Sequence, residues 1–291
     1  MSPDREQWYA DLLRFYPRAY RAERGAEMLA TLVEADRPLG RETAALVIGG
    51  LRARAGLGEL TSPGKLWLSA LRLAVLLLVA YATALAAAKA GRIVFSDLLM
   101  GRGLALPSDL GTLGAFAGGL LALLAFAAAR YRTGMLLTAG SFVLTLWSLS
   151  WYPVFALTLV DNEFWPLPLA FLLAVPLLLG PPRGAARPAW WLLAVPVAVV
   201  LLPTAFDASL GWQPYALYAA GAGALLWAVV DARVACAAGA LFLAQALTLL
   251  GYWTPGWSDN PFGPLFTIYS VCTVALVVAG SVGIRRQAAL W

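Results

Sequence analysis

The chain has 291 residues, of which 61% are hydrophobic and 13% are charged. Soluble domains carry about 25% charged residues, so this composition excludes a water-soluble fold for most of the chain and indicates a bilayer as its main solvent. The formal net charge is +5, but the first 64 residues balance nine Arg with nine acidic residues. A nucleic-acid-binding face needs a surplus of basic residues, and we expect no such face in this region.

Residues 1–62 predict a small cytosolic head made of three helices. Ser2-Pro3-Asp4 favours a helix start, because Ser caps the first turn, Pro is tolerated at its first position and an acid suits its dipole. Pro17 ends this helix after Tyr16. The three helices are predicted over residues 3–16, 18–35 and 41–55. The apolar stripe of the first is predicted at Trp8, Leu12, Leu13 and Tyr16.

The sequence of this head resembles a known family of helical domains. The similar stretches are residues 12–21 (LLRFYPRAYR), 25–32 (GAEMLATL) and 41–54 (RETAALVIGGLRAR). They resemble the permease prefix domain and the HAAS-type signalling domain of membrane proteins from high-GC bacteria. The resemblance implies a cytoplasmic regulatory or docking domain, with a PadR-type transcription regulator or an ABC-transporter subunit as its partner. It implies no catalytic residue.

Four arginines of the head form a candidate docking surface. They are Arg14, Arg18, Arg21 and Arg24, which lie within three helical turns of one another across Pro17. They can bind an acidic partner or anionic lipid headgroups. The simpler alternative is a solvated face, whose charge is balanced by Glu23, Glu27 and Glu34.

Residues 63–291 predict a membrane domain of eight helices, because a span needs about 20 mostly apolar residues. The predicted spans are residues 66–90, 110–129, 133–157, 164–180, 188–206, 213–230, 233–253 and 263–284. The fourth and fifth are interrupted by proline, including Pro176 and Pro196. The expected fold is therefore an all-α polytopic membrane protein with a cytosolic three-helix head.

The charges of the loops predict how these spans are oriented. Basic residues occur at one end of the spans, at Arg130, Arg132, Arg183, Arg187, Arg233, Arg285 and Arg286. Acidic residues occur at the other end, at Asp97, Asp109, Asp161, Glu163, Asp207 and Asp259, together with the basic residues Lys89, Arg92 and Arg102. The excess of basic residues on cytoplasmic loops predicts that both termini face the cytoplasm, in a bacterial inner membrane.

Tryptophans lie near both ends of the predicted spans. Those near the outer ends include Trp151, Trp165, Trp212 and Trp257, and those near the inner ends include Trp67 and Trp227. Indole rings favour the headgroup layer, so anchoring explains most of them. The four outer tryptophans are also candidate walls of a site for an amphiphile or lipid.

The predicted spans carry few polar groups. No Asp or Glu lies at midplane depth, and Arg72 is expected to snorkel toward the inner surface from one turn inside the first span. Thr138, Ser141, Thr145 and Ser148 share one face of the third span. They predict interhelical hydrogen bonds or, alternatively, the lining of a polar cavity. Gly111, Gly114 and Gly118 predict close packing of the second span.

These patterns favour a non-enzymatic membrane protein with a regulatory head. The chain has no His, and Cys236 and Cys272 lie in apolar runs, so no catalytic, metal-binding or cofactor-binding residue is predicted. A carrier or exporter component for a hydrophobic substrate is the alternative. An enzyme that acts on lipid is the weakest hypothesis, because it would need an active site without His.

Overall fold

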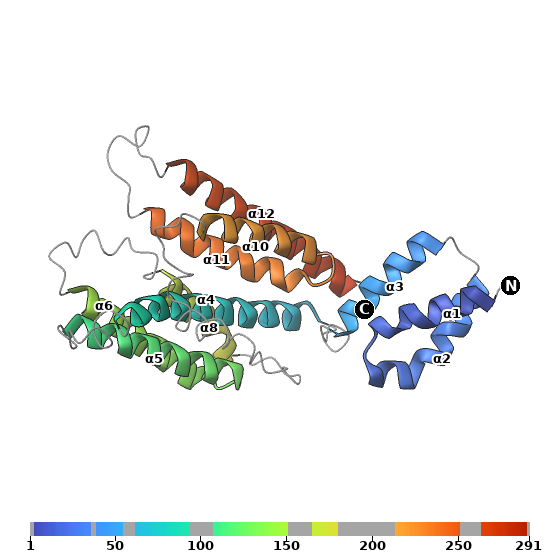
Figure 1. The fold of residues 1–291 in the computed structure, drawn as a ribbon, viewed down its shortest axis with the longest axis horizontal. Coiled ribbons are helices and arrows are strands. Elements are labelled where there is room, and N and C mark those ends of the chain that lie inside the picture. The colour runs from blue at the N-terminus through green and yellow to red at the C-terminus, as the bar shows by residue number, and fades with distance from the viewer. Residues whose placement is uncertain are drawn as a thin grey trace.

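The computed structural model describes residues 3–35, 39–54, 62–93, 107–150, 165–179, 213–250 and 263–289. All regular secondary structure in these ranges is helical, which confirms the predicted all-α class. Figure 1 shows short N-terminal helices at one end of the molecule and a bundle of longer helices extending away from them. We refer to the described residues up to 54 as the head and to those from 62 onward as the bundle.

The head consists of α1 (Pro3–Leu12), the 3-10 turn η1 (Leu13–Phe15), α2 (Arg18–Ala35) and α3 (Leu39–Arg54). The first helix is shorter than predicted, because Tyr16 precedes a proline and is extended, with ψ 151°. Leu13, Tyr16 and Leu46 belong to the apolar cluster that α1, η1 and α3 share. Burial and the stacked Tyr20 ring raise the pKa of the Tyr16 hydroxyl.

The predicted stripe of α1 is wrong at Trp8. That side chain is 50% exposed, whereas its neighbour Tyr9 is 1% exposed and lies in the head cluster. The Tyr9 hydroxyl donates a hydrogen bond to Oε2 of Glu42 at 2.6 Å. This partner on α3 allows a tyrosine to be buried without leaving its hydroxyl unsatisfied.

Seven described helices form the bundle. They are α4 (Pro63–Ile93), α5 (Pro107–Ala127), α6 (Tyr131–Ser150), α8 (Pro166–Leu179), α10 (Gln213–Trp227), α11 (Ala232–Leu250) and α12 (Gly263–Ala289). Helix α4 is central: it packs against α5 and α8 on one side and against α11 and α12 on the other (Figure 1). Helix pairs α5–α6 and α11–α12 are the most closely packed neighbours.

Five of these helices, α4, α5, α6, α11 and α12, are long and apolar enough to cross a membrane. They match five of the eight predicted spans. Helix α8 has 14 residues and α10 has 15, or about 21–23 Å each, which is shorter than a hydrocarbon core of about 30 Å. The predicted span over residues 188–206 lies outside the described residues. The described part of the chain therefore indicates a membrane protein with five long apolar helices.

Glycines bring α5 and α6 together, as the sequence predicted. A Cβ atom at Gly111 would lie 3.0 Å from Cβ of Ser148, and one at Gly118 would lie 2.9 Å from Oγ of Ser141. At Gly114 it would lie 3.1 Å from Cδ1 of Leu144. The missing side chains let the two backbones approach and let polar side chains reach across.

The turn between α5 and α6 offers a stabilising substitution. Ala129 has φ 58°, and N–H of Arg130 donates to the carbonyl of Ala125 at 2.8 Å, as in a Schellman ending. Because glycine adopts this conformation without a Cβ clash, Ala129→Gly should raise the free energy of unfolding by about 1 kcal/mol. Thermal unfolding in detergent is the measurement.

Ala128→Gly is the matched control for that change, since Ala128 is one residue away but its N–H bonds to the Leu124 carbonyl in helical fashion. Glycine there should lower stability by roughly 0.5–1 kcal/mol. Equal effects of the two substitutions would contradict this account of the turn.

Candidate functional site at the head–bundle junction

The short turn between α10 and α11 is the place where the head and several bundle helices meet. It closes with hydrogen bonds from N–H of Val230 and N–H of Asp231 to the carbonyl of Trp227, both at 2.8 Å. Three consecutive residues of this turn then bind three other elements. We define the junction as Arg52, Ser69, Val229, Val230, Asp231, Arg233 and Gln287.

The head contacts the junction through Arg52 in the last turn of α3. Its Nη2 donates a hydrogen bond to the carbonyl of Val229 at 2.8 Å, and the two residues are 177 positions apart in the sequence. Within the described residues its Nε has no hydrogen-bond partner. A guanidinium that binds a carbonyl at a turn fixes the end of α3 beside the bundle, where Figure 1 places it.

Asp231 and Arg233 form a buried ion pair at the start of α11. Their side chains are 6% and 12% exposed, and the Nη2–Oδ2 and Nε–Oδ1 distances are 2.6 and 2.8 Å. Arg233 Nη1 also donates to Oγ of Ser69 on α4 at 2.8 Å. This two-pronged pair neutralises both charges and ties the α10–α11 turn to the central helix.

The third contact comes from the end of α12. Gln287 is 5% exposed, and its Nε2 donates to the carbonyl of Val230 at 3.2 Å. Its Oε1 has no partner among the described residues. The turn is thus held by α3 through Val229, by α12 through Val230 and by α4 through the Asp231–Arg233 pair.

Sequence reasoning missed the junction, and Asp231 is the residue it overlooked. Asp231 comes directly before α11, and Oδ1 accepts from N–H of Arg233 at 3.0 Å, as a helix-capping acid does. An acid directly before an apolar run and two residues from an Arg is a helix-start signal. That signal identifies the cap but not the contact with Ser69.

Arg72 reaches toward the predicted inner end of the bundle but is buried there. It is 8% exposed, and its Nη2 donates to the carbonyl of Ala127 at 3.1 Å. That carbonyl is at the end of α5, where unpaired carbonyl groups attract cations. Arg72 therefore caps α5 at the same end of the bundle as the junction, one turn along α4 from Ser69.

Docking by the four predicted arginines stays a prediction. Arg14, Arg18 and Arg24 are exposed, whereas Arg21 is partly buried. Arg14 forms an exposed ion pair with Asp11, with an N–O distance of 3.2 Å. Its carbonyl accepts from Nη2 of Arg54 at 2.7 Å, which brings η1 next to the end of α3.

The predicted outer site stays a prediction. Trp165 is partly buried at the residue before α8. The other three tryptophans, Trp151, Trp212 and Trp257, lie outside the described residues.

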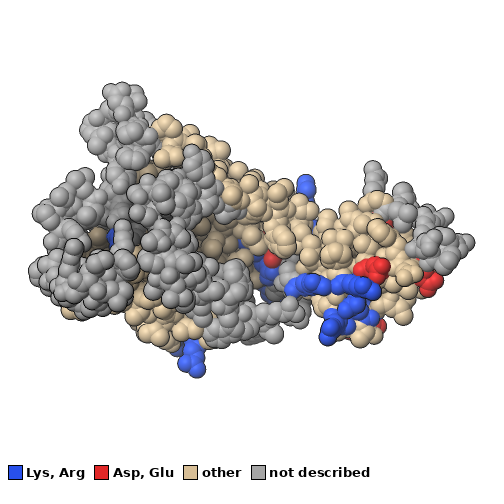
Figure 2. Space-filling view, in the orientation of Figure 1, with Lys and Arg blue, Asp and Glu red and all other residues tan. Residues whose placement is uncertain are grey.

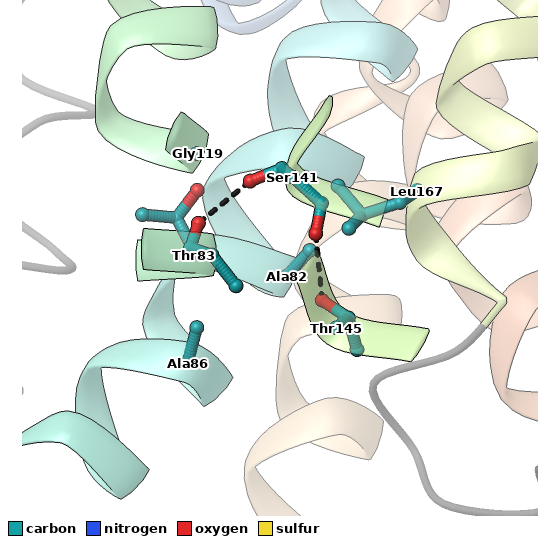
Figure 3. Close-up of a pocket in the computed structure, with 8 residues that line it drawn as sticks. Ala82, Thr83, Ala86, Gly119, Ser141, Thr145 and Leu167 are labelled. Atoms are coloured by element: carbon teal, nitrogen blue, oxygen red, sulfur yellow. Dashed lines mark hydrogen bonds between the residues drawn. The ribbon is translucent and has the colours of Figure 1, made fainter. Parts of the chain in front are cut away.

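The polar face of α6 lines a small pocket shared with α4, α5 and α8 (Figure 3). Oγ of Ser141 donates to the carbonyl of Ala115 on α5 at 2.6 Å, and Oγ1 of Thr145 donates to the carbonyl of Ser141 at 2.9 Å. Thr83 bonds back to Val79 on α4. The pocket has room for about one water molecule. Both predicted roles of this face, interhelical bonding and cavity lining, are therefore present.

Among the described residues, no three His, Cys, Asp or Glu side chains lie together in a way that would hold a metal ion. The chain matches no known protein family, and no curated protein and no solved structure matches it either. The geometry of the junction and the apolar helices therefore carry the functional argument.

Proposed function

We propose that the chain is a non-enzymatic, multi-pass protein of a bacterial inner membrane in which a cytosolic head regulates, or docks a partner onto, the membrane domain. The cytosolic domain spans residues 1–62 and the membrane domain of eight spans covers residues 63–291, with both termini in the cytoplasm. The body anchors the protein or senses an amphiphile at its outer face. The partner is a cytosolic regulator or an ABC-transporter subunit, in line with the resemblance of the head to permease prefix and HAAS-type domains.

The single observation that carries this proposal is the bond from Arg52 to the carbonyl of Val229. It connects the head to a turn that is also bound by α4 and α12. A partner that binds the head and displaces α3 would therefore also displace the turn between α10 and α11, which contacts the central helix α4 through Arg233. A head that served only as a solvated appendage would need no such contact.

The distribution of charge supports the proposed orientation. The exposed basic residues Arg130, Arg132, Arg285 and Arg286 lie at the end of the bundle that faces the head, and Asp109 lies at the opposite end of α5. This arrangement follows the excess of basic residues on cytoplasmic ends.

Arg52→Ala tests the coupling by hydrogen exchange on the full-length chain in detergent. Loss of the bond should accelerate exchange both in the last turn of α3 and in residues 228–231, because the two segments hold each other. The α5–α6 turn should be unaffected. Arg54→Ala is the matched control, since Arg54 bonds to Arg14 inside the head and its loss should leave residues 228–231 unchanged.

Unchanged exchange in residues 228–231 of the Arg52→Ala protein would refute the coupling. The docking part has a separate test, in which full-length protein is crosslinked in its native host and recovered. Recovery of a transcription regulator or an ATPase subunit is expected, with loss on deletion of residues 1–62. Recovery of neither protein would refute docking.

The carrier hypothesis ranks second. The pocket beside Thr83 lies among bundle helices but holds about one water molecule, which is far smaller than a hydrophobic substrate. Accumulation of a hydrophobic dye in vesicles that contain the protein would favour a carrier over a regulator.

A further inference from the structure

The end of the bundle that faces the head carries an exposed basic ring. Its members come from the start of α4, the α5–α6 turn and the end of α12. They are Lys65, Arg130, Arg132, Arg285 and Arg286, all of them exposed. Among the described residues of this end, Asp231 is the one acidic residue; it is 5% exposed and is already paired with Arg233. The positive charge of the ring is therefore not balanced by an exposed carboxylate there.

Two exposed tryptophans place this ring at the depth of lipid headgroups. Trp67 is 36% exposed and follows Lys65 by two residues, and Trp227 is 46% exposed at the end of α10. Indole rings concentrate at the boundary between hydrocarbon and water, and Lys and Arg side chains extend from there toward phosphate. The combination of aromatic and basic residues is typical of a membrane interface.

The head adds charge on its side nearest the bundle. Arg14 and Arg18 are exposed at η1 and the start of α2, and Arg14 also pairs with the exposed Asp11, a contact that lipid phosphate would compete for. The end of α3 links this region to the bundle, since Arg54 binds the Arg14 carbonyl and Arg52 binds the Val229 carbonyl. Figure 2 shows blue side chains at the neck between the two parts and on the adjoining flank of the head.

We propose that the basic ring, together with Arg14 and Arg18, binds the headgroup phosphates of anionic phospholipids and so holds the head against the inner membrane surface. Blue groups project from opposite edges of the molecule as well as from the neck in Figure 2. The phosphates of a lipid layer can contact all of these separated charges at the same time. A single acidic protein would have to extend around the head to do so. The proposal rests on the membrane setting of the proposed function but not on partner docking.

The test compares the full-length protein in nanodiscs of phosphatidylcholine alone with nanodiscs that also contain phosphatidylglycerol. The anionic lipid should raise the midpoint of thermal unfolding by roughly 3–6 °C. The variant Arg130→Gln/Arg132→Gln/Arg285→Gln/Arg286→Gln should lose at least half of this rise. Its matched control, Arg130→Lys/Arg132→Lys/Arg285→Lys/Arg286→Lys, keeps the charge and should keep the rise.

Thermal unfolding of the unaltered protein at high salt is a second measurement. It tests the proposal even if the Gln variant does not fold. High NaCl should remove the rise, because exposed charges are screened. Equal midpoints in the two lipids, or a full rise in the Gln variant, would overturn the proposal. So would an equal rise on adding inorganic phosphate or polyglutamate to phosphatidylcholine nanodiscs, because the surface would then fit free phosphate or an acidic protein. None of these results bears on partner recovery from the native host.

Discussion

Asp231→Ala should lower the free energy of unfolding of the full-length protein by about 3–5 kcal/mol, because it leaves the Arg233 guanidinium buried without its carboxylate. The side chains of Asp231 and Arg233 are 6% and 12% exposed in this ion pair, so solvent screens the charge that is left behind only weakly. Arg233→Ala should have a similar cost for the converse reason. Thermal unfolding in detergent should show midpoints lower by roughly 10 °C.

The double substitution Asp231→Ala/Arg233→Ala separates the ion pair from the packing around it. Removing both charges leaves neither one unpaired, so the double variant should be more stable than the sum of the single losses predicts. Asp11→Ala is the matched control, since Asp11 pairs with Arg14 while 55% of its side chain is exposed. It should cost about 0–1 kcal/mol. If the double variant instead lost as much free energy of unfolding as the two single variants together, the two side chains would act independently.

Loss of this ion pair should also affect the head. Asp231 lies two residues from Val229, whose carbonyl binds Arg52. If the turn moves when the pair is broken, α3 should exchange its amide hydrogens faster even though no head residue has changed. This links the stability of the bundle to the position of the head, which is the relation that a regulatory head requires.

The positions of most helices were predictable because apolar runs and helix-ending prolines are local signals. Helix α2 begins at Arg18, directly after Pro17, and α12 begins at Gly263, where its span was predicted. The end of α1 was predicted too far along the chain. Its last residues form η1 because Tyr16, before the proline, is held in extended conformation.

The junction was not predictable, because it depends on residues far apart in the sequence. Arg233 and Ser69 are 164 positions apart, and Arg52 and Val229 are 177 apart. Counting basic residues per loop identifies Arg233 as a cytoplasmic marker but takes no account of Asp231 beside it. The burial of Tyr9 in place of Trp8 has the same origin, since it depends on Glu42 of another helix.

Packing between α11 and α12 gives the second large effect. A Cβ atom at Gly280 would meet Sγ of Cys236 and would lie 2.9 Å from the backbone nitrogen of Cys236 and 3.1 Å from the carbonyl oxygen of Ala232. Two of these three atoms are backbone, so the helices must separate to admit even a methyl group. Gly280→Ala should therefore lower the free energy of unfolding by about 1–3 kcal/mol, although Ala is the better helix former.

Two further glycines complete a graded series for that prediction. Gly140 on α6 is exposed, and a Cβ atom there would meet no neighbouring atom within 4 Å, so Gly140→Ala should raise stability by up to about 1 kcal/mol. Gly118→Ala should fall between the two, because its nearest neighbour is a side-chain atom, the Ser141 hydroxyl at 2.9 Å, rather than backbone. A Gly280→Ala protein as stable as the Gly140→Ala protein would contradict this packing.

The Gly280 substitution also reports on the junction. Gln287 lies two turns further along α12 and binds the Val230 carbonyl, so a helix displaced at Gly280 should carry Gln287 away from the turn. Hydrogen exchange in residues 228–231 should then rise in Gly280→Ala but not in Gly118→Ala, whose clash lies between α5 and α6. If exchange there rises equally in both variants, the turn responds to general loosening of the bundle rather than to the contact from α12.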